Sequence, residues 1–248
     1  MATIEEFNRC GEELEKILLL RTSPIAVKML ESEADIPAGA MRPKKDYNYH
    51  LAQCQAFALS RRDGTTVAML KEDHWCPGAL MAYGMVPPVA LPGSLDKTHS
   101  HESFEYGKYI GIVTAPLKSA TFKPDVVIVY SNTTQLRNLL QPMDYDEIEQ
   151  VNGRYFPPSC AHAVVSPMLT GKYWVVLPDP GEYQRALGDE GEMMFAVPAD
   201  KILGLLAGLE KFRERGMSYR NHNYFMLPDF PRPDFYKAMF TQWGLEDY

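Results

Sequence analysis

The side chains with the most distinctive chemistry in this 248-residue chain are its four cysteines, Cys10, Cys54, Cys76 and Cys160. A thiolate can ligate a metal ion or act as a nucleophile, whereas a buried thiol behaves as a small apolar group. Two cysteines have a histidine two positions away, His74 before Cys76 and His162 after Cys160. Core packing is the commoner role for isolated cysteines, so the residue types alone leave ligation and packing both open.

The common catalytic motifs are absent. The sequence contains no G-x-x-x-x-G-K-[ST], G-x-G-x-x-G, H-E-x-x-H or G-x-S-x-G, so P-loop, dinucleotide-binding, zincin and α/β-hydrolase functions have no motif to support them. A thiol enzyme with Cys76 as nucleophile and His74 as base is a further alternative. Residues two positions apart do not face each other on a helix, so that geometry is unfavourable.

Charge and composition indicate a folded protein that does not bind nucleic acid. Apolar residues make up 46% and charged residues 23% of the chain, which is close to the average for globular domains. The net charge is −7 and no run of Lys or Arg is longer than two, so a polyanion finds no basic patch.

The sequence predicts a cytoplasmic protein with free thiols. Glu5 and Glu6 stand where a signal peptide carries basic residues, and the apolar run 17–20 is too short for a signal sequence. The uncharged stretch 76–95 is interrupted by four prolines and three glycines, so we expect no membrane helix and no membrane partner. Disulfides are disfavoured in the reducing cytosol, which leaves the cysteines as thiols or ligands.

Hydrophobic periodicity and breaker residues predict the elements that must position these cysteines. Strands are expected at 25–30, 65–70, 110–115, 126–130, 173–177 and 192–197. Helices are expected at 3–20, 47–61, 77–83, from 131 or 132 past 140, after Pro158, from 198 to 216 and at 235–243. Cys54 is thereby placed in the middle of a helix, Cys76 just after a strand, and Cys160 at the start of a helix.

The irregular alternation of strands and helices predicts a mixed α/β (α+β) fold. We expect a single compact domain with a mixed sheet flanked by helices, because no flexible linker divides the chain. Residues 1–213 are predicted to form the core domain, and residues 214–248 an aromatic-rich C-terminal extension that packs on it.

Several segments together resemble domain of unknown function (DUF) family 169, a family of uncharacterised bacterial and archaeal proteins. The resemblance covers residues 10 to 213. The matching segments are Ser23-Pro24-Ile25-Ala26-Val27-Lys28, Cys54-Gln55, Arg62-Asp63-Gly64, Cys76-Pro77-Gly78-Ala79, Ala115-Pro116-Leu117, Pro124-Asp125-Val126-Val127-Ile128, Pro158-Ser159-Cys160 and Glu192-Met193-Met194-Phe195-Ala196-Val197-Pro198.

The resemblance implies that Cys54, Cys76 and Cys160 act as a set. Many members carry a fourth cysteine near a turn that here reads Leu177-Pro178-Asp179-Pro180-Gly181, without one. Three thiolates can hold a [4Fe–4S] cluster and leave one iron for Asp179, a histidine, water, sulfide or substrate. Zinc is the alternative cofactor, held by the three cysteines with His162 or His74.

The expected function is therefore that of a cytoplasmic iron–sulfur protein with redox or open-site cluster chemistry, which the resemblance places in anaerobic metabolism. Its partners would be a small-molecule substrate or a redox protein, with a homo-oligomer left open, and an oxidoreductase or a lyase are the enzyme classes considered. The alternative is a non-redox binding or accessory module for a small apolar or acyl ligand, with structural cysteines.

Three further features have a simpler explanation. Cys10 lies on the apolar stripe of the first helix, which favours core packing over ligation. The pair His99 and His101 resembles a metal clasp, but in a polar loop such a pair is more often solvated. Asp179 stands in a Pro/Gly turn where an aspartate commonly serves local hydrogen bonding.

Overall fold

The computed structural model describes residues 2–87, 102–142, 151–155, 157–214, 219, 232 and 234–245. Its strands form one seven-stranded sheet in the order β2-β3-β1-β4-β7-β6-β5. Only β5 and β6 pair in parallel, and all other neighbours are antiparallel. The strands are β1 (Ile25–Leu30), β2 (Val67–Leu70), β3 (Gly111–Pro116), β4 (Val126–Ser131), β5 (Asn152–Arg154), β6 (Trp174–Val176) and β7 (Met193–Pro198).

Nine α-helices lie within the described residues. They are α1 (Ile4–Leu18), α2 (Pro43–Tyr47), α3 (Gln53–Ala58), α4 (Pro77–Ala82), α5 (Thr133–Leu140), α6 (Ser159–Thr170), α7 (Pro180–Arg185), α8 (Ile202–Glu214) and α9 (Asp234–Gln242). Helix α1 begins with the capping box that its sequence predicts, since Thr3 and Glu6 each accept the other's backbone N–H. Asn132 caps α5 through the N–H of Gln135.

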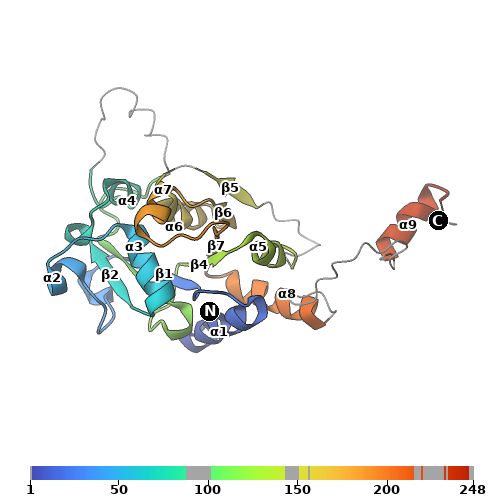
Figure 1. Cartoon of the computed structure of the whole chain (residues 1–248), viewed down its shortest axis with the longest axis horizontal. Coiled ribbons are helices and arrows are strands. Elements are labelled where there is room, and N and C mark those ends of the chain that lie inside the picture. The colour runs from blue at the N-terminus through green and yellow to red at the C-terminus, as the bar shows by residue number, and fades with distance from the viewer. Residues whose placement is uncertain are drawn as a thin grey trace, which may run out of the picture.

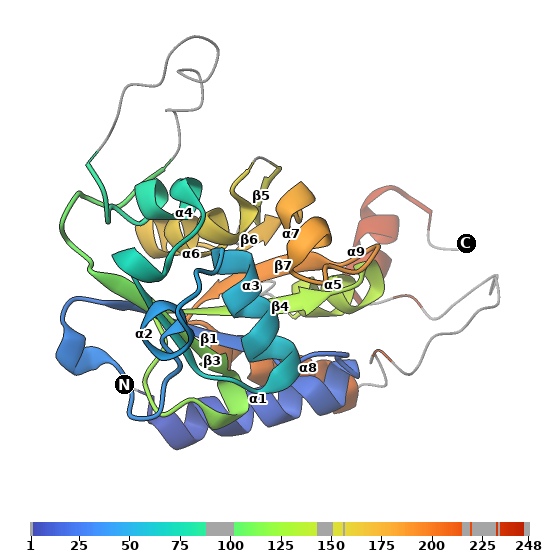
Figure 2. The same ribbon diagram turned by 60° about the vertical axis from the view of Figure 1, so that its left-hand side comes forward.

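The sheet has a hydrophobic core on each face, and together they make one compact domain (Figure 1). Strand β4 is buried along its whole length, as its unbroken apolar sequence predicts. Its side chains alternate, so that Ile128 points to the side of α3, α4 and α6 while Val127 and Val129 point to the side of α1, α5 and α8. Figure 2 shows α1 and α8 on one side of the sheet and α4, α6 and α7 on the other. The predicted mixed α/β fold is therefore confirmed.

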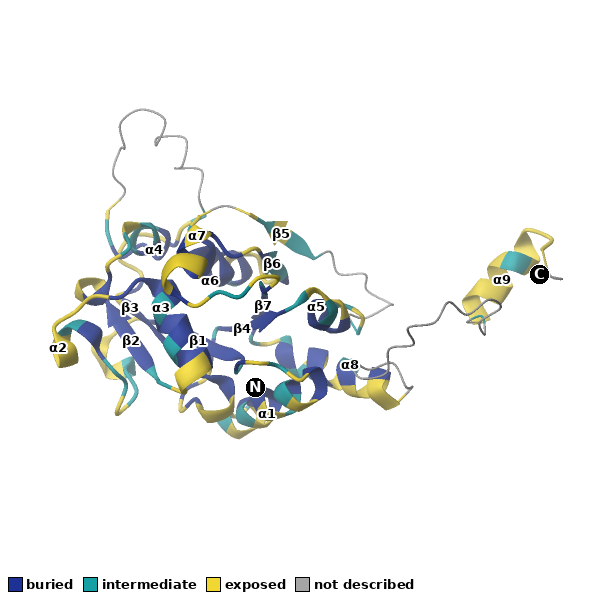
Figure 3. Cartoon of the chain, viewed as in Figure 1, coloured by how far each residue is buried: buried dark blue, intermediate teal, exposed yellow. Residues whose placement is uncertain are grey.

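Strands β1 to β4 and β7, together with most of α6, are the most deeply buried elements (Figure 3). Cys54 and Cys160 belong to the core on the side of α3 and α6, whereas Cys10 belongs to the core beneath α1. The core role predicted for Cys10 is confirmed, and its burial raises the pKa of its thiol to about 12.

The single helix predicted over residues 47–61 is wrong. Helix α2 ends at Tyr47, residues 48–52 are not helical, and α3 begins only at Gln53 before a π-helical turn at Leu59–Asp63. The interruption arises because Leu51 pairs with residues 73–75, accepting the N–H of Trp75 at 2.8 Å. Cys54 consequently lies at the start of a helix and not in its middle.

Part of the prediction falls outside the described residues. His99, His101 and most of the segment 215–233 lie there, together with much of the predicted binding pocket. Helix α9 has no buried residue, and the packing of the C-terminal extension on the core stays a prediction. Within the described part of the chain, no helix is both long and apolar enough to cross a membrane.

Candidate cysteine site

Each of the three predicted ligands lies at the beginning of a helix. Cys54 and Cys160 are the second residues of α3 and α6, and Cys76 is the N-cap of α4. Asp179 is the N-cap of α7. Helix α3 packs against α6 and α7, and α4 packs against α6, so the four helix starts come together on one face of the sheet.

Local backbone contacts fix these helix starts relative to one another. Leu51 donates its N–H to the carbonyl of Asp73 at 3.0 Å, which holds the chain before Cys54 beside the chain before Cys76. At the start of α4, a Cβ added to Gly78 would lie 3.1 Å from Cγ of Pro158, the N-cap of α6. Glycine is therefore what lets the segment after Cys76 approach the segment before Cys160 so closely.

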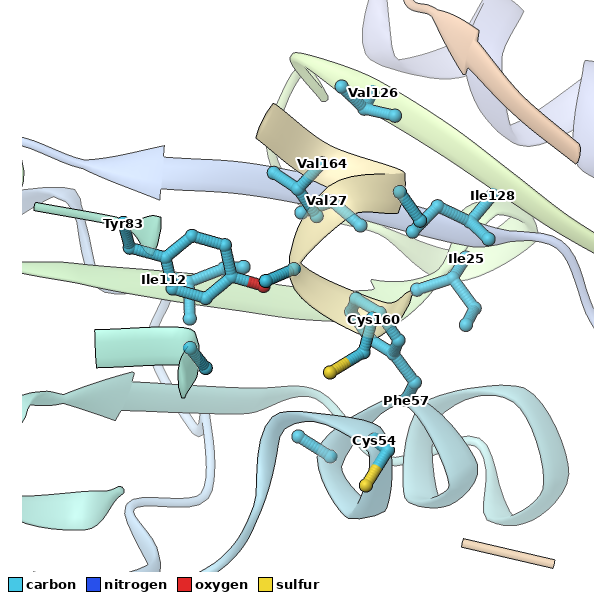
Figure 4. Close-up of a cluster of buried hydrophobic side chains, with 14 of the residues drawn as sticks. Ile25, Val27, Cys54, Phe57, Tyr83, Ile112, Val126, Ile128, Cys160 and Val164 are labelled. Carbon is cyan, nitrogen blue, oxygen red and sulfur yellow. The ribbon is translucent and has the colours of Figure 1, made fainter. Parts of the chain in front are cut away.

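Cys54 on α3 and Cys160 on α6 are neighbours in the same core, and each thiol shifts the pKa of the other (Figure 4). The hydrogen bond from Cys160, opposed by burial and aided by the guanidinium of Arg185, lowers the pKa of Cys54 to about 7. The same hydrogen bond and burial raise the pKa of Cys160 well above its usual value. Cys54 is therefore the more acidic of the two thiols, and its sulfur lies 4.0 Å from the carbonyl oxygen of Gly181.

Cys76 is the least buried of the three cysteines and completes the group on the side nearest solvent. The guanidinium of Arg185 on α7 interacts electrostatically with both Cys54 and Cys76. It also lies 5.7 Å from the ring centroid of Trp75, a side chain that is 65% exposed. Arg185 therefore connects the buried thiolate with the surface beside Cys76.

Tyr83, just after α4, lies among all three cysteines. Its side chain is fully buried, and its hydroxyl has no hydrogen-bond partner among the described residues. Burial, followed by the charges of Cys160, Cys76 and Cys54, raises the pKa of this phenol well above its usual value. In Figure 4 the hydroxyl points toward α6 and Cys160. All three cysteines thus act electrostatically on one buried phenol.

Glu182 on α7 is a second buried polar group at this site. Its Oε2 accepts the hydroxyl of Tyr130 at 3.1 Å, while its Oε1 has no partner among the described residues. Burial, followed by the charge of Cys54, raises the pKa of Glu182 to about 8. The carboxyl group is therefore mostly protonated at neutral pH.

A buried ion pair holds Tyr130, the hydrogen-bond partner of Glu182, in place. Arg61 donates from both terminal nitrogens to Glu192, at 3.0 and 3.1 Å, and its guanidinium lies 4.0 Å from the ring centroid of Tyr130. Arg61 also donates to the carbonyl of Leu187, in the loop after α7. This ion pair ties α7 to the sheet.

Asp179, the predicted fourth ligand, is buried and directs its carboxylate to backbone amides. Oδ2 accepts the N–H of Ser159 at 2.8 Å, and Oδ1 accepts the N–H groups of Gly181 and Glu182 at 2.7 and 3.4 Å. Both oxygens therefore serve as caps at the starts of α6 and α7. Ligation of a metal by Asp179 stays a prediction.

The two histidines near the cysteines are both buried. His74 packs edge-on against Tyr83, with ring centroids 6.3 Å apart, and burial lowers its pKa to about 4. Its ring nitrogens have no hydrogen-bond partner in the described part of the chain, so no His74–Cys76 hydrogen bond forms there. His162 lies on α6, within the same buried segment as Cys160. Among the described residues, no group of three or more His, Cys, Asp and Glu side chains could hold a metal ion.

Sequence reasoning found the cysteines and Asp179 but not Tyr83, Glu182 or Arg185. Tyr83 and Glu182 become notable through burial, and all three through their electrostatic interaction with the thiols. No short motif in the sequence marks them. The turn predicted over residues 177–181 overlaps a helix in the structure, because Pro180 and Gly181 are the first residues of α7.

Comparison with known proteins supports the resemblance found in the sequence. A family model for DUF169, described as uncharacterised ArCR, matches residues 13–208. No curated protein and no solved structure matches the chain. The matched span includes the three cysteines, Tyr83, Asp179 and Glu182. This chain is a member of the DUF169 family.

Proposed function

We propose that this protein is a cytoplasmic iron–sulfur protein in which Cys54, Cys76 and Cys160 ligate a [4Fe–4S] cluster. The observation that supports the proposal is that the three cysteines start helices on one face of the sheet and all act electrostatically on the buried Tyr83 phenol. They come from helix starts that are 22 and 84 residues apart in sequence. Cysteines that serve only as small apolar residues would have no reason to act on the same buried group.

The polar groups at the site support a bound group more than simple core packing. The Tyr83 hydroxyl and Glu182 Oε1 lack partners, and an unpartnered buried polar atom costs roughly 1–3 kcal/mol. A bound cofactor or substrate would supply those partners. Cys54 is already favoured as a thiolate by Cys160 and Arg185, and thiolate is the form that binds metal.

No three His, Cys, Asp or Glu side chains in the described part of the chain are placed to hold a single metal ion, which favours a cluster over zinc in this proposal. Zinc needs sulfur ligands about 3.8 Å from one another, as follows from Zn–S bonds of about 2.3 Å. The ligand sulfurs of a cubane lie farther apart, at about 6–7 Å, and come from separate segments more readily. The positive end of α6 and the guanidinium of Arg185 would also favour an anionic cluster.

The fourth iron would lack a cysteine ligand. Both oxygens of Asp179 accept backbone N–H groups, so ligation by this carboxylate would weaken the caps of α6 and α7. We therefore assign the fourth position to an exchangeable water, sulfide or substrate molecule. When bound, the cluster would supply redox or Lewis-acid chemistry at that iron. Trp75 and Arg185 mark the solvent side, where a small substrate or a redox partner protein would approach.

Anaerobic reconstitution with iron and sulfide tests the proposal. Wild type and a Cys10→Ser control should each take up iron and sulfide in equal amounts and turn brown. Cys54→Ser, Cys76→Ser and Cys160→Ser should each lose most of the bound iron while keeping the far-ultraviolet circular dichroism of the wild type. Equal iron uptake by all four variants, or uptake by none of the proteins including wild type, would overturn the assignment.

A further inference from the structure

Arg185, an exposed residue on α7, has a guanidinium that contacts two separate elements. Gly181 lies one helical turn before Arg185, on the same face of α7. A Cβ added to Gly181 would lie 3.1 Å from Cζ of Arg185 and nearer still to Nη2. The guanidinium also lies over the ring of Trp75, with Cζ 5.7 Å from the ring centroid. Glycine at position 181 therefore lets the arginine fold back over the first turn of the helix.

This position brings the positive charge to residues that adjoin two of the cysteines. The carbonyl oxygen of Gly181 lies 4.0 Å from Sγ of Cys54. Trp75 directly precedes Cys76, and its N–H is fixed by a hydrogen bond of 2.8 Å to the chain before α3. The electrostatic interaction of Arg185 with both cysteines agrees with this geometry. Arg185 therefore lies at the solvent side of the cysteine site.

Arg185 forms no ion pair with a carboxylate within the described part of the chain. By contrast, the two buried arginines of that part, Arg42 and Arg61, pair with Asp73 and Glu192. A guanidinium carries five N–H donors in a fixed plane. The donors of Arg185 that face water are therefore available to a ligand.

The chemistry of Arg185 and Trp75 selects a class of ligand. A guanidinium forms two parallel hydrogen bonds with a carboxylate, and the charges of the two groups cancel. A phosphate group carries nearly two negative charges, of which a single arginine compensates only one. The Trp75 side chain is 65% exposed and offers a flat apolar surface to the rest of the ligand. These features fit a small monocarboxylate with an apolar or aromatic body.

We propose that Arg185, folded over Gly181 and against Trp75, binds the carboxylate group of a small monoanionic substrate at the solvent side of the cysteine site. The inference rests on the proposed function and names the substrate class of the same site. Its test uses the full chain without iron, so that cluster binding and carboxylate recognition can fail separately.

Alkylation of Cys76 measures this recognition with two reagents of nearly the same size. Iodoacetate carries a carboxylate, and iodoacetamide an uncharged amide. In both reactions the Cys76 sulfur, after its proton has passed to water, bonds to carbon as the carbon–iodine bond breaks, and iodide leaves with the electron pair. Peptide mass spectrometry gives the ratio of the two rates, which is divided by the same ratio for the uncharged thiol 2-mercaptoethanol. The thiolate fraction cancels, because both reagents react with the same thiol.

We expect iodoacetate to be favoured at Cys76 of the wild type by about 3- to 10-fold over the reference thiol, since one charge-assisted contact is made. Arg185→Gln should remove this preference. Gly181→Ala should reduce it, because the new Cβ displaces the guanidinium. Arg62→Gln is the matched control and should retain it, because Arg62 is an exposed arginine that donates to the carbonyl of Leu187.

Benzoate and benzamide share a ring and differ in charge, so they test binding itself. Benzoate should slow the alkylation of Cys76 by iodoacetamide in the wild type and not in Arg185→Gln. Benzamide at the same concentration should not slow it in either protein. Phenyl phosphate tests the alternative anion and should protect less than benzoate. If Cys76 does not react with either reagent, titration calorimetry with benzoate makes the same comparison between wild type and Arg185→Gln.

Three results would overturn the inference. The first is a wild type without a preference for iodoacetate, or an Arg185→Gln protein that keeps the preference. The second is equal protection by benzamide and benzoate, which would indicate an apolar contact alone. The third is stronger protection by phenyl phosphate, which would identify a phosphate ligand. Failure to take up iron, with the carboxylate preference intact, would count against the proposed cluster and not against this inference.

Discussion

Ser159 and Asp179 each donate a backbone N–H to the side chain of the other. The N–H of Ser159 donates to Oδ2 of Asp179 at 2.8 Å, and the N–H of Asp179 donates to the hydroxyl of Ser159 at 3.1 Å. Each residue stands at the start of its helix, next to Cys160 in α6 and three residues before Glu182 in α7. These two hydrogen bonds therefore fix Cys160 relative to the buried carboxyl group of Glu182.

Replacing Asp179 should cost stability because its carboxylate caps two helices. We expect Asp179→Ala to lower the free energy of unfolding by about 2 kcal/mol, since a lost N-cap and a buried N–H without a partner add up. Asp200→Ala removes an exposed aspartate and serves as control, with a change below about 0.5 kcal/mol. Urea denaturation measures both. Equal stability of the two variants would contradict the double cap.

Cys54 should titrate near neutral pH in the metal-free protein. The hydrogen bond from Cys160 and the charge of Arg185 lower its pKa to about 7. Cys160→Ala and Arg185→Met should each raise this pKa, with the larger rise in Cys160→Ala, because the hydrogen bond is the larger cause. Thiolate absorbance in the ultraviolet, recorded against pH, measures the midpoint. A Cys54 midpoint near 9 in the wild type would show that the thiol pair does not form.

Glu182 should make the protein less stable as pH rises from about 4.5 to about 8. Between its ordinary pKa of 4.5 and its folded pKa of about 8, the folded state keeps a proton that the unfolded state has released. Glu182→Gln removes this titration. The stability of Glu182→Gln relative to wild type should therefore increase by at least about 1 kcal/mol across that range.

Comparing Glu182→Gln with wild type also cancels the effect of His74 on the pH dependence of stability. That effect has the opposite sign to the effect of Glu182. The folded pKa of His74 is about 4, so its contribution to stability is lost as pH falls below its ordinary value. Urea denaturation at several pH values gives the difference between Glu182→Gln and wild type. A difference that stays constant with pH would mean that Glu182 is ionised in the folded protein.

The buried Arg61 should matter far more than its exposed neighbour Arg62. Arg61→Ala leaves Glu192 as a buried charge without its partner, and we expect a loss of about 3–5 kcal/mol. Arg62 donates to the Leu187 carbonyl from an exposed position, so Arg62→Ala should cost less than about 1 kcal/mol. Thermal unfolding compares the two. Similar losses would contradict the role of Arg61 in anchoring α7.

The regular parts of the fold were predictable from local signals. The apolar run of β4, the Asn132 cap of α5 and the Thr3–Glu6 box of α1 act within a few residues, so the sequence alone indicates them. The division of the helix expected over residues 47–61 was not predictable, because it depends on pairing between Leu51 and a segment more than twenty residues away.

Of the residues at the candidate site, only the proposed ligands were predictable from the sequence. Cysteine is a rare and recognisable residue, so Cys54, Cys76 and Cys160 could be selected in advance. Tyr83 and Glu182 are common residue types, and their lack of partners is a property of the packed structure. Asp179 was expected to serve local hydrogen bonding, and it does accept the N–H groups of Gly181 and Glu182. Its burial and its capping of α6 were not predictable, because they depend on a contact across twenty residues.

The most direct test of the central claim is the iron and sulfide content of the native protein, purified without oxygen. The account predicts a brown protein with about four iron and four sulfide per chain. Its Mössbauer spectrum should distinguish one iron, without a cysteine ligand, from the other three. A colourless protein that contains neither iron nor sulfide, or one that contains only stoichiometric zinc, would contradict the account.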